Sequence, residues 1–230
     1  RVHGWDVVNE AIPDGPGGLR DSKWRRIIGD DFIEQAFRFA RNADPKAELY
    51  YNDYALVDRR KRARTIVMLK GLIERGAPID AVGMQGHYSL DRPPASEVEQ
   101  AIKDFAALGL KVMITELDVD VLPSPGRVGV ADISRREAAH PRLDPYRDGL
   151  PDSVQQRLAE RYAELFRVFL RHREHVTRVT IWGLDDGHTW LNHFPVRGRT
   201  NHPMLFDRNL QPKPAFFAVI TAGQETPPSR

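Results

Sequence analysis

The sequence lacks cysteine entirely across its 230 residues. Disulfides and thiolate metal sites are therefore excluded, although a chain without cysteine fits a cytoplasmic, periplasmic or secreted protein equally well. Long apolar runs are missing too, and none approaches the roughly 18 residues that a membrane span requires. We therefore expect no membrane partner. A hydrophobic share of 41% is enough for an ordinary globular core.

An excess of charge of one sign is also absent, since 34 Lys and Arg residues face 32 Asp and Glu residues and leave a net charge of +2. No overall field draws such a chain to nucleic acid, and a neutral polymer fits better as a partner. One basic cluster, RRKRAR at residues 59–64, opens a helical pattern. We interpret this cluster as a solvated helix face and assign it no function.

The chain begins at Arg1, without an initiator Met or a signal-like segment, and runs straight into strand-like sequence. We expect that a segment upstream has been removed. The residues alone leave the compartment open.

Short β-rich runs alternate with segments of helical period, which is typical of βα units around a parallel sheet. The predicted strands cover residues 2–9, 47–52, 81–86, 110–117 and 178–184. Apolar residues at helical spacing follow them, and one such set is Ala63, Ile66, Val67 and Ile73, before a helix end at Gly76. A strong helix is predicted from about Asp152 and a closing helix around Phe216–Ile220.

Two long polar stretches interrupt this pattern, at residues 123–151 and 185–205. Their length indicates functional loops. Long loops after the carboxyl ends of strands favour a TIM barrel, whose active site lies on that face. Only five βα units are present where a barrel needs eight, so an open doubly wound sheet is the alternative. The tail TPPSR, residues 226–230, is predicted to be disordered.

Two carboxylates occupy equivalent places, because Glu10 ends the first predicted strand and Glu116 ends the fourth. Both would face one mouth of a parallel sheet. Glycoside hydrolysis needs such a pair, with one carboxyl protonated to donate to the leaving oxygen and one ionised to attack the anomeric carbon. A Glu after a strand is more often a solvated loop residue, so the neighbouring residues have to decide.

Those neighbours are polar or aromatic in otherwise apolar strands. Asn9 precedes Glu10, and Gln85 and His87 end the third strand, where alternation predicts that their side chains share a face. Asp118 could orient His87. Taken singly, each also fits a plain structural role.

Trp182 and Trp190 flank the loop after the last strand. Their indole faces could stack on sugar rings while the N–H groups donate to hydroxyls, although tryptophan there also fits simple packing.

Five blocks carry a specific resemblance. They are WDVVNEAI, YYNDY, GMQGHYS, ITELDVDVL and the run that begins IWGLDDGHTWLNHF. In this order they resemble the successive blocks of glycoside hydrolase family 10, chiefly endo-1,4-β-xylanases, from Trp5 to about Ile220. The resemblance implies a (β/α)8 barrel of which this chain holds strands 4 to 8 with their helices. It also implies one catalytic region over residues 1–222, a disordered tail over residues 223–230, and export from the cytoplasm as the favoured localisation.

The resemblance further implies that Glu10 is the acid/base, Glu116 the nucleophile, and no cofactor or metal is used. His87 and Asp118 would support the nucleophile. The residues implied to bind sugar are Asn9, Asn52, Gln85, Trp182 and Trp190, with Tyr54, Arg199 and Asn201 on the leaving-group side.

We therefore expect a retaining endo-1,4-β-xylanase that binds xylan or xylo-oligosaccharides. Strands 1 to 3 of the resembled barrel have no counterpart here, so a complementing N-terminal segment or a strand-exchanged copy is an expected partner. One rival reading is an inactive or only xylan-binding remnant. Another alternative is an active enzyme whose substrate is a cellulose-type glucan.

Overall fold

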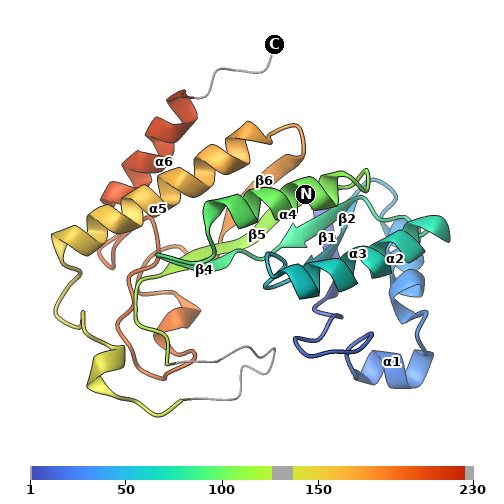
Figure 1. The fold of residues 1–230 in the computed structure, drawn as a ribbon, viewed down its shortest axis with the longest axis horizontal. Helices are drawn as coiled ribbons and strands as arrows, with labels where there is room; N and C mark the ends of the chain where they lie inside the picture. Colours follow the sequence, from blue (N-terminus) through green and yellow to red (C-terminus); the bar gives the residue numbers. More distant parts are fainter. Residues whose placement is uncertain (1, 126–136, 226–230) are drawn as a thin grey trace. The chain divides into compact units, whose positions relative to one another are not determined.

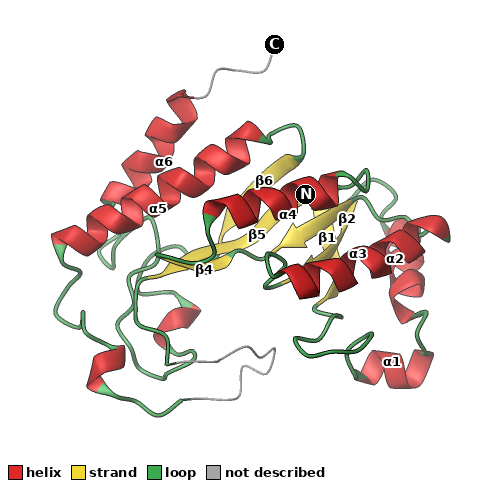
Figure 2. Ribbon diagram, in the orientation of Figure 1, coloured by secondary structure: helices red, strands yellow, loops and turns green. Residues whose placement is uncertain are grey.

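The structure is a computed structural model that describes residues 2–125 and 137–225. Its larger elements, drawn in Figures 1 and 2, are β1 (Gly4–Asn9), α1 (Lys23–Ile28), α2 (Phe32–Ala43), β2 (Glu48–Asp53), α3 (Arg59–Glu74), β3 (Ala81–Met84), β4 (His87–Ser89), α4 (Ala95–Ala106), β5 (Lys111–Asp120), α5 (Asp152–Arg171), β6 (Val176–Ile181) and α6 (Pro214–Glu225). Two single 3-10 turns, η1 (Pro141–Leu143) and η2 (Trp190–Asn192), lie in the long loops.

The chain divides into two compact units that interleave along the sequence. Unit 1 comprises Arg1–Gly86, Glu97–Thr115 and Glu174–Val179, and unit 2 comprises His87–Ser96, Glu116–Arg173 and Thr180–Arg230. The division falls inside β5, between Thr115 and Glu116.

Unit 1 is built on parallel strand pairs. β1 pairs with β2, β2 with β3, and β3 with the first half of β5, where Ala81 lies opposite Lys111. β3 is buried and apolar throughout, as parallel strands covered by helices require, whereas β2 is apolar or aromatic in its middle and ends in the buried polar residues Asn52 and Asp53. The interior includes the fully buried side chains of Leu49, Phe37 and Phe105, the last two from α2 and α4.

α3 begins and ends where the sequence predicts. The side chain of Asp58 accepts hydrogen bonds from the backbone N–H groups of Arg60 and Lys61, at 3.0 and 2.9 Å, and so caps the first turn. After the helix, Gly76 takes a φ of 72°, a backbone conformation that suits glycine.

The buried face of α3, however, differs from the apolar set in the sequence. Val67 is 71% exposed, whereas Lys61 and Arg62 are buried with Leu69 and Leu72. Lys61 pairs with Asp53 at 2.7 Å and Arg62 with Asp104 at 2.8 Å, so partners outside the helix neutralise both charges. The interpretation of residues 59–64 as a solvated face is therefore wrong for these two side chains.

Unit 2 contains β4, which pairs in parallel with the second half of β5, so that His87 lies opposite Asp118. The long helices α5 and α6 lie side by side within this unit, as Figure 1 shows. The fully buried Tyr162 of α5 donates a hydrogen bond to the carbonyl of Pro203, at 2.7 Å. This bond anchors the loop after β6 to the helix layer.

The strands match the predicted runs with three differences, of which one is that β6 covers Val176–Ile181 and ends before Trp182 instead of running to residue 184. The third run is interrupted, since β3 ends at Met84, Gly86 takes a φ of 86° and β4 begins at His87. The uninterrupted alternation assumed for Gln85 and His87 is therefore absent. The fourth strand is longer than predicted and extends to Asp120. The short helix α1 was not predicted.

The predicted tail of residues 223–230 has its boundary inside α6, which ends at Glu225, and residues 226–230 lie outside the described residues. Part of the predicted functional loop at 123–151, residues 126–136, also lies outside them. Within residues 2–125 and 137–225, no helix is long and apolar enough to cross a membrane.

Candidate active site

Glu10 follows directly after β1 in unit 1 and has an unusual backbone. Its φ is 57°, in the left-handed region that residues other than glycine seldom adopt. Such a conformation costs about 1–3 kcal/mol and persists only where neighbouring groups hold it. Here the N–H of Glu10 donates to the carbonyl of Asn52, at 2.9 Å, and the Arg20 guanidinium donates to the carbonyl of Glu10, at 2.7 Å.

The side chain of Glu10 contacts one amide of a small amide network. Gln85 donates from Nε2 to Glu10 Oε1 at 3.0 Å and to Asn9 Oδ1 at 3.3 Å. Asn52 donates to the same Asn9 oxygen, at 3.1 Å. The structure thus brings four predicted site residues, Asn9, Glu10, Asn52 and Gln85, into one network in unit 1.

The buried end of this network depends on Thr115, which the sequence reading missed. Its hydroxyl donates to Asn52 Oδ1 at 2.6 Å. Gly83 makes this bond possible, because a Cβ at that position would collide with both the Asn52 amide and the Thr115 methyl group. Thr115 directly precedes Glu116, but nothing in the sequence pairs it with Asn52.

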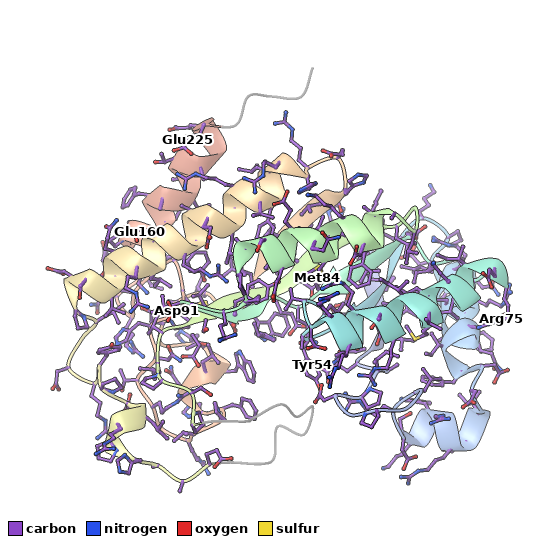
Figure 3. The ribbon with its side chains drawn as sticks, viewed as in Figure 1. Tyr54, Arg75, Met84, Asp91, Glu160 and Glu225 are labelled. Atoms are coloured by element: carbon purple, nitrogen blue, oxygen red, sulfur yellow. The ribbon has the colours of Figure 1, made fainter. Side chains whose placement is uncertain are left out.

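Tyr54 lies on the loop between β2 and α3, where Figure 3 labels it. Its hydroxyl donates to Asp14 at 2.6 Å and accepts from Arg20 at 3.3 Å. The Lys61 ammonium sits 3.3 Å from the ring centroid. The hydroxyl and one ring face are thus engaged inside unit 1.

Glu116 lies in unit 2, in the second half of β5, and its partner is a histidine. His87 Nε2 lies 3.2 Å from Glu116 Oε2, while His87 Nδ1 lies 3.0 Å from Asp118 Oδ1. The contact predicted between Asp118 and His87 is therefore present. One imidazole bridges two carboxylates of the same strand.

The charge state of His87 follows from these contacts. Burial opposes the charged imidazolium, but Asp118 and Glu116 outweigh it and raise the pKa of His87 to about 9. At neutral pH the ring is therefore a cation that donates to both carboxylates. This cation lies directly beside the carboxyl of Glu116.

Trp190 completes this arrangement in unit 2. Its indole N–H donates to the second oxygen of Asp118, at 2.7 Å, and its ring lies 4.9 Å from the His87 ring. Phe194, which sequence reading missed, stacks on Trp190 at 5.0 Å with an interplanar angle of 15°. Trp182, by contrast, is 45% exposed and is held through its backbone N–H, which donates to Leu117.

Arg199 and Asn201 gather around Asp120 in unit 2. Asn201 is fully buried and donates to Asp120 Oδ1 at 2.7 Å, and Arg199 lies 3.7 Å from Asp120 Oδ2. Burial raises the pKa of Asp120 despite the Arg199 charge. These contacts favour a supporting role for Asn201 over direct contact with a sugar.

Among the described residues, no group of three or more His, Asp or Glu side chains is arranged to hold a metal ion.

The fold and these side chains together place the chain among the glycoside hydrolases built on βα units. Residues 1–222 match the family model for glycosyl hydrolase family 10, and the chain belongs to this family. It is 46% identical over 220 residues to an endo-1,4-beta-xylanase A of Xylanibacter ruminicola, covering 96% of this chain and 59% of the relative. It is 42% identical to a thermostable celloxylanase of Thermoclostridium stercorarium, covering 95% and 53%.

Solved structures give the same picture. A GH10 endoxylanase from a sugarcane soil metagenome aligns with a TM-score of 0.92 at 46% identity, covering 95% of this chain and 63% of that one. A mutant in complex with xylotriose aligns with a TM-score of 0.82 at 40% identity, covering 95% and 62%. The fold is thus that of an incomplete (β/α)8 barrel, strands 4 to 8 with their helices, and the open doubly wound sheet is excluded. The chain spans less than two thirds of the length of these relatives.

Proposed function

We propose that the protein is a retaining endo-1,4-β-xylanase, with Glu10 as general acid/base and Glu116 as nucleophile. The observation that carries the proposal is the contrast between the two carboxylates. The amide of Gln85 donates to the carboxyl of Glu10, and the Arg20 guanidinium contacts the backbone carbonyl of Glu10, whereas a charged imidazole contacts the carboxyl of Glu116. An acid/base has to gain and lose a proton in each turnover, while a nucleophile has to stay ionised. Membership of family 10 supports the same assignment.

In the first step, the carboxylate of Glu116 attacks the anomeric carbon while the carboxyl of Glu10 gives its proton to the glycosidic oxygen. The C–O bond to the leaving sugar breaks, and a covalent xylosyl ester forms on Glu116. In the second step, ionised Glu10 takes a proton from water, and the oxygen of that water attacks the same carbon. The ester bond breaks and Glu116 returns to its ionised form.

The hydrogen-bond pattern indicates which groups bind the sugar. Asn9 is exposed, and its Oδ1 accepts from both Gln85 and Asn52, so its Nδ2 is the group oriented by the network for a sugar hydroxyl. Trp182 offers an exposed indole face for stacking. The indole N–H of Trp190 donates to Asp118, so Trp190 contributes to sugar binding through the shape of its ring.

Cellulose-type glucans are a second candidate substrate, favoured by the celloxylanase among the relatives. Xylose lacks the exocyclic hydroxymethyl group of glucose, and a ring as large as that of Trp190 disfavours that group. We expect faster turnover of an aryl xylobioside than of the matching cellobioside.

We also propose that a further N-terminal βα segment, from the same chain or from a strand-exchanged copy, completes the sugar-binding groove. Within unit 1, Trp5 of β1 and Trp24 and Ile27 of α1 are 46%, 67% and 79% exposed. Apolar surface of this kind is usually covered by a partner. Intact mass together with N-terminal sequencing of the purified protein identifies the segment if it belongs to the same chain.

The roles of the two glutamates are tested by azide rescue of Glu116→Gly and Glu10→Ala with an aryl xylobioside. Azide takes the place of the nucleophile in the first variant and should give the α-xylobiosyl azide. In the second variant it attacks the covalent intermediate and should give the β-azide. Wild-type turnover in Glu116→Gly would contradict the proposal. Binding of xylohexaose by calorimetry without release of reducing sugar would favour a binding remnant.

A further inference from the structure

We infer that Arg20 is a positioning residue that holds the carboxyl of Glu10 in place by clamping the backbone on its carboxyl side. The inference rests on the proposed acid/base role of Glu10. Its starting point is the left-handed backbone of Glu10, which has a φ of 57°. This conformation turns the side chain away from the direction it would have if the extended backbone of β1 continued. The residues that fix this conformation decide where the carboxyl points.

The clamp is made by hydrogen bonds from a single residue, two from its side chain and one from its backbone. Arg20 donates from Nε to the carbonyl of Glu10, at 2.7 Å, and from Nη2 to the carbonyl of Ile12, at 3.2 Å. Its own backbone N–H donates to the carbonyl of Ala11, at 2.7 Å. Three consecutive carbonyls, those of residues 10, 11 and 12, thus accept from one residue. Only a guanidinium presents parallel donors in this fixed geometry.

Arg20 is in turn held by groups that belong to unit 1. Its Nη2 also donates to the hydroxyl of Tyr54, whose own proton goes to Asp14. Lys61 covers the Tyr54 ring and pairs with buried Asp53. Burial opposes the charge of Arg20, but Tyr54, Asp53 and Glu10 outweigh it and raise the pKa of Arg20. The guanidinium is therefore a permanent cation with a fixed orientation.

Two further arginines hold the rest of the same loop through its carbonyls. Arg64, from the basic cluster at residues 59–64, donates to the carbonyls of Pro13, at 2.8 Å, and Gly15. Arg25 donates to the carbonyl of Leu19, at 2.7 Å. These contacts account for Arg64, which the sequence left without a function. Arg20 is the member of the set that reaches the catalytic residue itself.

The test uses kcat/KM for aryl β-xylobiosides whose leaving groups range from phenol to 2,4-dinitrophenol, in the protein as its gene encodes it. A good leaving group needs no proton, so misplacement of Glu10 should slow only the poor ones. For Arg20→Ala we expect a loss of about 30- to 100-fold with the phenyl substrate, as displacement of a catalytic group by about 1 Å predicts. With the dinitrophenyl substrate the loss should be under about threefold, since binding is unchanged.

Two further measurements keep the test decisive. Arg20→Lys keeps the charge but loses the two parallel N–H donors of the guanidinium, so it should show an intermediate loss of kcat/KM with the same leaving-group dependence. If Arg20→Ala does not fold, Arg20→Lys provides the test. Guanidinium ion should restore part of the activity of Arg20→Ala. Arg26→Ala is the matched control, because this exposed arginine of α1 contacts Asp21 and no carbonyl near Glu10.

The inference is overturned if Arg20→Lys loses activity equally with all leaving groups or loses none. Glu10→Ala distinguishes this failure from a failure of the proposed function. If Glu10→Ala shows the steep leaving-group dependence and Arg20→Lys does not, only the role of Arg20 is wrong. If Glu10→Ala shows none, the acid/base assignment itself fails.

Discussion

The surroundings of Glu10 in unit 1 and of Glu116 in unit 2 are built from different chemistry. The carboxyl of Glu10 accepts from the amide of Gln85, which keeps the same charge at every pH at which the protein is folded. The carboxyl of Glu116 lies beside an imidazole whose pKa is raised to about 9 by Asp118 and Glu116. This difference in surroundings is what the proposed division of roles between the two glutamates rests on.

The largest expected difference between the two surroundings appears when each glutamate is removed. Glu116→Gly should reduce kcat/KM by on the order of 10⁴- to 10⁶-fold for every substrate, because no ester can form. Glu10→Ala should lose about 10²- to 10⁴-fold with poor leaving groups and little with good ones. Steady-state kinetics with a graded series of aryl xylobiosides measures both. If both variants lose kcat/KM equally with every leaving group, the proposed difference in role between the two glutamates is contradicted.

Loss of the cation beside Glu116 should have the next largest effect. In His87→Asn the carboxylates of Glu116 and Asp118 lose the charge that compensates them, and we expect kcat/KM to fall about 10- to 100-fold at pH 7. The exposed His3→Asn serves as control. An unchanged kcat/KM in His87→Asn would show that the imidazolium is not needed.

The same residue predicts a pH dependence of stability with a definite sign. The pKa of His87 is raised in the folded protein, so its contribution is fully present below the unfolded value of about 6.5 and is lost as the pH rises through about 9. The free energy of unfolding, from urea titrations, should fall by about 3 kcal/mol over that range. His87→Asn should lack this part of the fall. Identical pH curves for both proteins would contradict the charge assigned to His87.

A smaller effect is expected for Trp190→Phe, which keeps an aromatic ring beside His87 and Phe194 but removes the N–H that reaches Asp118 at 2.7 Å. A buried carboxylate oxygen left without its donor costs about 1–3 kcal/mol. Urea unfolding measures this loss, with the exposed Phe39→Leu as control. Equal stability of the two variants would mean that the indole contributes only its ring.

The sequence predicted the strands and the place of Glu10 after β1 well, because parallel strands expose polar residues at their carboxyl ends and bury apolar ones before them. Glu116 lies inside β5 and not at its end, since that strand continues to Asp120. The sequence also failed where charged residues pair in the interior. Lys61 and Arg62 read as a solvated face, yet Asp53 and Asp104 neutralise them in the interior. The apolar period of α3 could not reveal this, since it counts apolar side chains and takes no account of buried ion pairs.

The site shows the same limit. Family resemblance named Gln85 and His87, but the break in the strand at Gly86 gives them separate tasks, and local alternation could not show that. Arg20 lies in a loop rich in glycine and proline, where no periodicity identifies a residue that binds three carbonyls. Its importance depends on the backbone conformation of Glu10, which only the folded chain reveals.

Covalent trapping tests the division of roles between the two glutamates most directly. The protein, as its gene encodes it, is incubated with 2,4-dinitrophenyl 2-deoxy-2-fluoro-β-xylobioside, which should form the ester but hydrolyse slowly. Peptide mapping by mass spectrometry then locates the sugar. We predict a single fluoroxylobiosyl group on Glu116 and none on Glu10. A label on Glu10, or full inactivation with the label on another residue, would contradict the assignment.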